Sequence, residues 1–182
     1  MADVFVRPAR LIDAGDFAGV QHRTWRAASE AFGLPEPPEL SQIERAWEHS
    51  ITAPPSARHR SWVAVGDEAV VGVAAVTPAS DPDLDTERCV ELVLLAVDPS
   101  ARRGGHGSRL LTAAMQTASD NGELEAVSWV TSGDDVVLGF LEESGWVADG
   151  AFRTLADSDT DDASELRQVR VSTSLEREAP DA

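Results

Sequence analysis

Lysine and tyrosine are both absent from this sequence, and Cys89 is its single cysteine. The absence of lysine excludes a nucleotide site of the Walker A type, which needs a Gly-Lys-Ser or Gly-Lys-Thr step. One cysteine allows no internal disulfide and no thiolate metal cluster, so we expect a reducing compartment. The sequence also has no long apolar run. We therefore expect neither a signal peptide nor a membrane span, and a cytoplasmic protein.

Positive charge is scarce as well. Fifteen basic residues stand against 32 acidic ones, which gives a formal net charge of −17 over 182 residues. Nucleic acids and anionic membrane surfaces bind to basic faces, so we expect neither as a partner. The four histidines do not have the spacing of metal-binding motifs, so the sequence predicts no metal site.

The strongest positive signal lies between residues 91 and 111. Residues 92–97 form an uninterrupted apolar run, which is typical of a strand buried on both faces, and Asp98 begins a turn after it. Apolar residues recur at helical spacing from Leu110 onward, after three glycines at Gly104, Gly105 and Gly107. The glycines therefore open a helix. The free N–H groups and partial positive charge of its N-terminus favour an anion such as a pyrophosphate.

Two glycine-rich designs remain once Walker A is excluded. The dinucleotide fingerprint Gly-x-Gly-x-x-Gly fails, because its third glycine would fall at Leu110. The dinucleotide fingerprint also needs an acidic residue at the end of the strand that follows the helix. The candidates Glu123 and Glu125 instead stand before the apolar run of that strand. The pattern Gln/Arg-x-x-Gly-x-Gly/Ala fits every fixed position of Arg102-Arg103-Gly104-Gly105-His106-Gly107.

With this turn the sequence resembles the GNAT superfamily of N-acetyltransferases, whose motif A joins the fourth strand to the third helix. A second segment, Gly139-Phe140-Leu141-Glu142-Glu143-Ser144-Gly145-Trp146, is similar to the Phe-Tyr-x-x-x-Gly-Phe part of the family's motif B. The resemblance implies an α/β GNAT fold, with a mixed central sheet of about six to seven strands flanked by about four helices. We expect one such domain over residues 1–175 and a disordered tail at 176–182.

Local patterns place the elements of this fold. Periodicity predicts strands at 4–9, 61–65, 70–77, 88–97, 125–130, 146–155 and 166–172. Helices are predicted from Asp13, as a cap, to Phe32, from a capping box at 41–44 to Ile51, and from the glycine turn to Asn121. A short fourth helix is predicted between Asp134, its cap, and Ser144, and an acidic loop at 157–165.

The resemblance implies acetyl-CoA as the cosubstrate and no metal. The backbone of Leu95, Ala96 and Val97 would hydrogen-bond the pantetheine arm, and an N–H near Val97 would stabilise the oxyanion. Seven turn residues and two residues of motif B complete the implied cofactor-binding set: Arg102, Arg103, Gly104, Gly105, His106, Gly107, Ser108, Asp134 and Phe140. His106 occupies a variable position of the motif and is expected to be exposed.

Glu91 is the predicted general base, because it begins the buried strand and burial would raise its pKa toward neutrality. The alternative is a glutamate in solvent or paired with Arg88, and Glu87 is a weaker candidate base. Trp25 and Trp47 lie in the helices that flank the acceptor site in the family. Either ring would suit a substrate cation, with core packing as the alternative.

The family's usual general acid, a tyrosine of motif B, is replaced by Leu141, so water would protonate the departing thiolate. The resemblance implies an N-acetyltransferase that moves an acetyl group from acetyl-CoA to a primary amine by direct attack in a ternary complex. Small-molecule amines are slightly favoured over proteins. The missing tyrosine supports an alternative, a non-catalytic acyl-CoA-binding sensor, and a homodimer through the last strands stays open.

Overall fold

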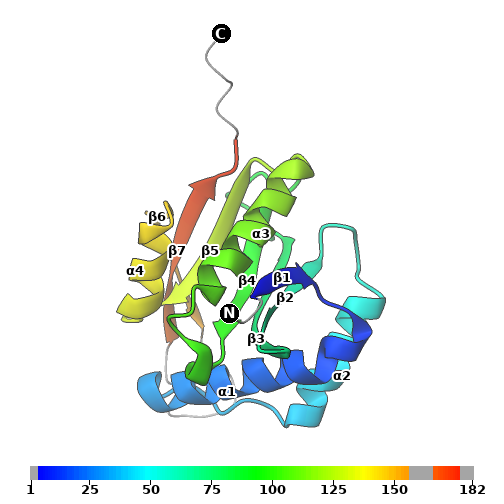
Figure 1. The fold of residues 1–182 in the computed structure, drawn as a ribbon. Coiled ribbons are helices and arrows are strands. Elements are labelled where there is room, and N and C mark those ends of the chain that lie inside the picture. The colour runs from blue at the N-terminus through cyan, green and yellow to red at the C-terminus, as the bar shows by residue number, and fades with distance from the viewer. Residues whose placement is uncertain (1–3, 156–165, 177–182) are drawn as a thin grey trace.

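The computed structural model describes residues 4–155 and 166–176 and shows a mixed sheet between two layers of helices (Figure 1). Within these residues the sheet has seven strands in the order β1-β2-β3-β4-β5-β7-β6. Only β4 and β5 are parallel neighbours there. The strands are β1 (Phe5–Pro8), β2 (Arg60–Gly66), β3 (Ala69–Pro78), β4 (Cys89–Val97), β5 (Glu125–Thr131), β6 (Val147–Leu155) and β7 (Leu166–Ser174).

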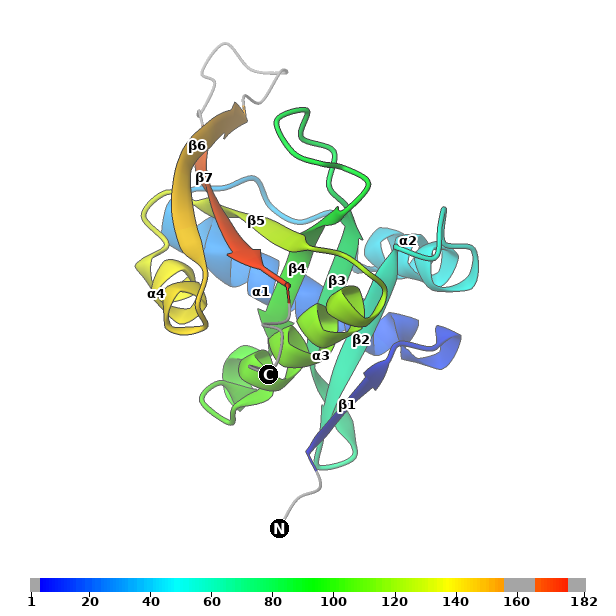
Figure 2. The same cartoon turned by 90° about the horizontal axis from the view of Figure 1, so that it is seen from above.

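The helices divide between the two faces of the sheet, with α3 and α4 on one face and α1 and α2 on the other (Figures 1 and 2). In the same residues they are α1 (Ala14–Phe32), α2 (Leu40–Thr52), α3 (His106–Asp120) and α4 (Asp135–Glu143), with short 3-10 turns at Leu11–Asp13 and Pro99–Ala101. None of the helices in the described part of the chain has the length and apolarity needed to cross a membrane.

Each face of the sheet carries its own apolar core. On the face of α3 and α4, Leu110 and Leu141 pack against Val90 and Leu92 of β4. On the opposite face, Phe17 and Val20 of α1 pack against β2, β3 and the end of β4. Both α1 and α3 present apolar residues at helical spacing to the sheet, which fixes their orientation. The central strand β4 therefore lies between the two cores.

The predicted α/β architecture is confirmed, and the predicted strands and helices agree with the structure to within a few residues. The hairpin between β2 and β3 turns at Asp67 and Glu68, which both have positive φ, of 49° and 65°. The predicted acidic loop at 157–165 lies outside the described residues. So does the predicted tail, except for Glu176.

Two details of the predicted helix starts are wrong. Asp13 occupies the N-cap position of α1 but makes no capping bond. Its carboxylate accepts instead from Nη1 and Nη2 of Arg7, at 2.6 and 2.8 Å, and the pKa of Asp13 is lowered mainly by this bond. The second helix begins at Leu40, after Glu39, so Ser41 lies inside the first turn and not at the cap.

Candidate active site

The parallel strands β4 and β5 stay paired over only three residues of each. The register joins Cys89–Val90–Glu91 to Glu125–Ala126–Val127 and ends there, although both strands continue. Just beyond the last pair, Ser128 Oγ donates to the carbonyl of Leu92 at 2.9 Å. The part of β4 from residue 93 to 97 therefore has β3 as a neighbour on one side and no strand register on the other within the described residues.

Backbone groups of Leu95 and Val97 point toward this unpaired side. Asp98 N–H donates to Val71 O in β3, and the register pairs Ala96 with Val73. Because alternate residues of a strand direct their N–H and C=O groups to opposite sides, those of Ala96 face β3. Leu95 and Val97 then present theirs toward β5. Two of the three residues predicted to bind the pantetheine arm thus offer backbone groups that no described strand pairs with, and Ala96 is held in the β3 ladder.

A bulge in β4 changes the expected burial of this strand. The pairing passes from Ala75 with Leu94 to Val76 with Leu92, so Val93 is the extra residue. Its side chain is 46% exposed, and Leu94, Leu95 and Val97 are only partly buried. The prediction that residues 92–97 are buried on both faces is therefore wrong, because β5 leaves β4 where the bulge begins.

The glycine turn opens α3 as predicted. Gly105 is the N-cap residue, with φ of 74°, and Arg103 also has positive φ, of 64°. The first bond of the helix runs from Arg109 N–H to Gly105 O at 3.2 Å. The amides of His106, Gly107 and Ser108 precede that bond, so they have no partner within the helix and form its positive end.

His106 is 8% exposed, so the expectation of an exposed side chain is wrong. Its ring packs between two glycines: a Cβ at Gly104 would lie 2.7 Å from His106 Nε2, and a Cβ at Gly66 would lie 3.2 Å from Cε1. The ring thus joins the glycine turn to the β2–β3 hairpin. His106 Nδ1 is buried and has no hydrogen-bond partner among the described residues. The contact with Gly66 is non-local, which is why the motif alone did not reveal it.

Phe140 of α4 reaches the other side of the turn. A Cβ at Gly107 would lie 3.6 Å from the ring of Phe140 and 3.7 Å from the side chain of Val97. The start of α3, the end of β4 and α4 therefore meet around Gly107. Asp134 caps α4, as predicted, and its Oδ1 accepts from Val137 N–H at 3.1 Å. Leu141, at the position of the family's tyrosine, is 2% exposed and belongs to the core.

The arginines of the turn differ in their contacts. Arg102 and Arg103 are exposed. Arg109 is exposed as well, and its Nη1 donates to Gly104 O at 2.9 Å, which folds its guanidinium back over the turn. Guanidinium groups beside free helix amides suit a phosphate ligand.

Glu91 lies on β4 in the last pair with β5, opposite Val127. Its side chain is only partly exposed, and burial raises the pKa of its carboxyl above the ordinary 4.5. The charge of Arg153 acts in the opposite direction, and that of Asp81 adds to the rise in pKa. The structure shows no ion pair between Glu91 and Arg88 within the described residues, and Glu87 is exposed in the preceding loop. A half-buried carboxyl with a raised pKa is suited to accept a proton.

Trp129 and two arginines form a cluster on the same face, which the sequence did not reveal. The Cζ atom of Arg153 lies 4.5 Å from the centroid of the Trp129 ring, and that of Arg170 lies 5.8 Å away. Arg170 forms ion pairs with Asp81 at 2.5 Å and with Asp149 at 2.6 Å. The alternation of polar and apolar residues along β7 indicates on which face of the sheet Arg170 lies. Its two acidic partners, however, come from β6 and from the loop after β3.

The two predicted substrate tryptophans are held by structural contacts. Trp47 Nε1 donates to Gln21 Oε1 at 2.5 Å, and its ring centroid lies 4.1 Å from that of Phe17. Trp25 Nε1 donates to Pro35 O at 3.0 Å, which ties the loop after α1 to that helix. Both therefore shape the α1–α2 region, and a direct role in substrate binding stays a prediction.

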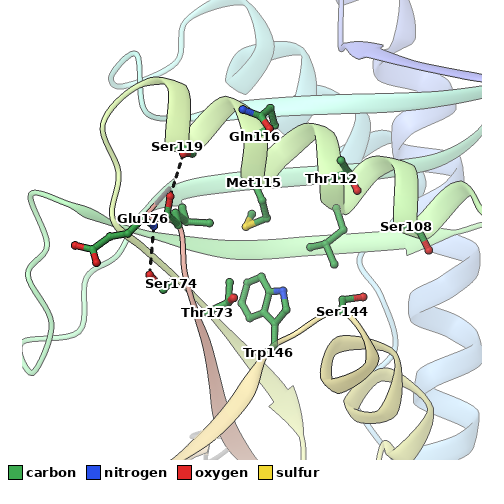
Figure 3. Close-up of a pocket in the computed structure, with 12 residues that line it drawn as sticks. Ser108, Thr112, Met115, Gln116, Ser119, Ser144, Trp146, Thr173, Ser174 and Glu176 are labelled. Carbon is green, nitrogen blue, oxygen red and sulfur yellow. Dashed lines mark hydrogen bonds between the residues drawn. The ribbon is translucent and has the colours of Figure 1, made fainter. Parts of the chain in front are cut away.

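A groove of about 490 Å³ runs along α3 on the face that α3 shares with α4 (Figure 3). It begins beside the glycine turn at Ser108 and continues to Leu175, just after the end of β7. Trp146 forms part of its wall, and Ser119 Oγ donates to Leu175 O at 3.0 Å at its far end. In the described ranges, no group of three or more histidine, cysteine or acidic side chains could hold a metal ion.

Comparisons with known proteins agree with this geometry. The sequence model of the "Acetyltransferase (GNAT) family" matches residues 21–146. Human N-acetyltransferase 8 is 38% identical over 66 residues, which are 36% of this chain and 29% of the human protein. The chain thus matches less than a third of that relative's length.

Solved structures show the same fold at low sequence identity. An N-acetyltransferase from Staphylococcus aureus Mu50 has a TM-score of 0.73 and 16% identity, with 96% of this chain and 99% of that chain covered. The yncA structure from Salmonella typhimurium, which contains its cofactor acetyl-CoA, has a TM-score of 0.71 and 16% identity, with 98% of both chains covered.

Proposed function

Because this chain belongs to the acetyltransferase (GNAT) family, we propose that it transfers the acetyl group of acetyl-CoA to a primary amine by direct attack in a ternary complex. The observation that carries the proposal is one juxtaposition. The backbone of Leu95 and Val97, which pairs with no strand on the β5 side within the described residues, adjoins the amides at the start of α3 that have no partner within that helix, and Glu91 lies on the same strand. We propose further that residues 1–175 form a single catalytic domain and that the acceptor is a small molecule.

The binding half of the proposal assigns acetyl-CoA to the turn and the unpaired strand edge. The amides of residues 103–108 would donate to the pyrophosphate, with Arg102 and Arg103 beside it as cations. The pantetheine arm has amide groups of its own, so it would bond to Leu95 and Val97 as an added strand. Phe140 would pack against the arm. Asp134 acts in this proposal through α4, whose first turn it caps.

The chemical half assigns a proton acceptor and an oxyanion donor. An ammonium has no lone pair with which to attack, so Glu91 would take a proton from the acceptor amine. The Val97 N–H would donate to the thioester oxygen, where negative charge develops during the attack. Because Leu141 offers no proton donor, water would protonate the departing CoA thiolate. Holding the two reactants side by side supplies the rest of the rate gain.

Thermal unfolding with acetyl-CoA tests the binding half. Ligand at a hundred times its Kd stabilises a protein by about 2.7 kcal/mol, a rise of several degrees in Tm for a chain of this length. Gly105→Glu should abolish the rise, because the new side chain occupies the turn. Gly122→Glu is the matched control, since Gly122 also has positive φ, of 87°, but lies beyond the other end of α3. No rise with the wild-type protein would contradict the binding site.

Release of free CoA in the presence of a panel of amines tests the chemical half. We expect release that depends on both acetyl-CoA and a primary amine, and that Glu91→Gln reduces. Binding of acetyl-CoA without release for any amine would favour the acyl-CoA sensor over the transferase.

A further inference from the structure

One face of the sheet carries a carboxylate, an aromatic ring and a guanidinium on three of its strands, β4, β5 and β6. Glu91 pairs with Val127, and Trp129 follows two residues later on β5, on the same face. Trp129 pairs with Arg170 of β7, and Arg153 of β6 pairs with Gln168, which shares the face of Arg170. Glu91, Trp129 and Arg153 therefore all project from the face opposite α3 and α4.

The guanidinium of Arg153 is oriented but forms no ion pair with a carboxylate in the part of the chain that the structure describes, although its charge lowers the pKa of Asp81. Its Nε donates to Gln168 Oε1 at 2.7 Å, and its Cζ lies 4.5 Å from the centre of the Trp129 ring. Within the described residues it forms no ion pair, and its two terminal nitrogens make none of the hydrogen bonds that the structure shows there. Arg170, in contrast, is neutralised by Asp81 and Asp149.

The charge of Arg153 reaches Glu91. Arg153 lowers the pKa of Glu91 against the larger effect of burial. Since Arg153 starts on β6 and its guanidinium lies over Trp129 of β5, the side chain crosses β7 toward β4. On this face of the sheet, Glu91 can thus attract an ammonium group and Arg153 can attract an anionic group.

We propose that the acceptor is a primary amine that also carries a carboxylate, and that Arg153, held by Trp129 and Gln168, binds this carboxylate while Glu91 receives the amine. The inference rests on the proposed acetyl transfer and specifies its substrate class. A guanidinium presents two parallel N–H donors that match a carboxylate. In a chain with a net charge of −17, a local cation that forms no ion pair within the described residues is what an anionic group of the acceptor needs.

Kinetics with paired acceptors test the proposal. Each pair consists of an amino acid and the amine formed by removing its carboxyl group, for example lysine with cadaverine and phenylalanine with phenethylamine. We expect a lower KM for the carboxylate-bearing member of the preferred pair. Arg153→Gln should raise that KM about tenfold to a hundredfold, the range for a lost bond between charged groups. It should leave the KM for acetyl-CoA and the KM for the decarboxylated amine unchanged. Arg153→Lys should restore part of the loss, because it keeps the charge but not the fork.

Arg167→Gln is the matched control. The Cζ atom of Arg167 lies 4.1 Å from the centre of the Phe152 ring, so it makes the same type of contact. Phe152 pairs with Val169, which packs into the core between the sheet and α3. Arg167 therefore projects from the α3 face of the sheet, whereas Arg153 projects from the other face. The control should leave the KM of every acceptor unchanged. An equal Tm rise with acetyl-CoA in wild type and Arg153→Gln shows that the variant is folded.

The outcomes separate the two proposals. Release of CoA with the decarboxylated amines but not with the amino acids would overturn the carboxylate subsite and leave acetyl transfer intact. A uniform fall in kcat for all acceptors in Arg153→Gln, with no selective rise in the KM of the carboxylate-bearing ones, would also overturn it, because Arg153 would then act only on Glu91 or on the fold. No release of CoA with either member of any pair would overturn the acetyl transfer itself, and the subsite with it.

Discussion

Glu91 stands opposite Val127 in the last residue pair that joins β4 to β5. On one side of this pair the two strands are hydrogen-bonded neighbours, and on the other side the backbone of Leu95 and Val97 is unpaired within the described residues. The carboxylate therefore lies at the point where the strands separate. This position explains its partial burial, and it is where the proposed mechanism needs a base.

Glu91→Gln should lower turnover by about 10²- to 10⁴-fold, the usual contribution of a general base. The deficit should be largest above the pKa of Glu91 and should shrink at high pH, where the free amine no longer needs a base. The pH profile of kcat/KM for both proteins measures this, and the Kd for acetyl-CoA should stay the same. Equal kinetics across the pH range would remove Glu91 from the mechanism.

The same substitution should stabilise the fold at neutral pH. Burial raises the pKa of Glu91 in the folded state above its ordinary 4.5, which applies to the unfolded state. At a pH between the unfolded-state pKa and the folded-state pKa, the folded state therefore binds more protons than the unfolded state. Stability from this group is then fully present below about pH 4.5 and is lost as pH rises through the folded pKa. Glutamine does not titrate. Tm scans from pH 4 to pH 8 should show Glu91→Gln gaining on the wild type as pH rises, and an advantage that shrinks with pH would contradict the direction of the shift.

An ion pair with one buried and one partly exposed member holds the beginnings of β4 and β5 together. Arg58 donates from Nε and Nη2 to Glu123 at 2.6 and 2.8 Å, and from Nη2 to the carbonyl of Cys89 at 2.8 Å. The Glu123 side chain is 6% exposed, so Arg58→Ala would leave a buried carboxylate unpaired. We expect a loss of roughly 2–3 kcal/mol in urea unfolding, below the range for fully buried pairs because Arg58 is partly exposed.

Two further variants distinguish the unpaired charge from the loss of packing. Arg58→Met combined with Glu123→Leu should be close to neutral, because it removes both charges. Arg26→Ala, which breaks an exposed pair with Glu30 at 3.8 Å, should change the stability by less than about 0.5 kcal/mol. If Arg58→Ala behaves like Arg26→Ala, the pair contributes nothing to the fold.

The elements of this fold could be predicted because their signals are local. Apolar periodicity marks the strands and helices, and Gly122 and Gly145 stop α3 and α4 with positive φ, of 87° and 86°. The glycine turn before α3 and the place of Glu91 on β4 could also be predicted, since each belongs to one short segment, and the role of Glu91 as a base stays a prediction.

The rest of the candidate site depends on pairings between distant segments. Arg153 meets Trp129 across β7, and no local pattern encodes that strand order. His106, at the start of α3, is buried because Gly66 of the β2–β3 hairpin leaves room for its ring. Val93 is exposed because β4 bulges where β5 departs. In each case the sequence shows the type of the residue but not which distant residue lies beside it in the fold.

Gly104→Ala should weaken acetyl-CoA binding although alanine is the smallest possible change. The new Cβ would lie 2.7 Å from Nε2 and 2.9 Å from Cδ2 of His106, and the buried ring has little space in which to move. The turn must then shift, and the amides of α3 shift with it. We expect a Kd raised by about tenfold or more, equivalent to roughly 1.4 kcal/mol, in isothermal titration. Gly139→Ala is the control, because a Cβ there meets nothing within 4 Å. An unchanged Kd for Gly104→Ala would show that the turn does not depend on the packing of His106.

Restoring the family's tyrosine should not restore a general acid. Leu141 is 2% exposed and packs in the core that contains Trp146, so a larger side chain at this position meets filled space. Leu141→Tyr and Leu141→Phe should each cost about 1–3 kcal/mol of stability through overpacking. Because the two differ only in the phenolic hydroxyl, their kcat values should be equal if water protonates the thiolate. Measuring kcat for both, at a temperature where both are folded, isolates the hydroxyl. A kcat for Leu141→Tyr above those of Leu141→Phe and the wild type would show that α4 can place a proton donor at the leaving group after all.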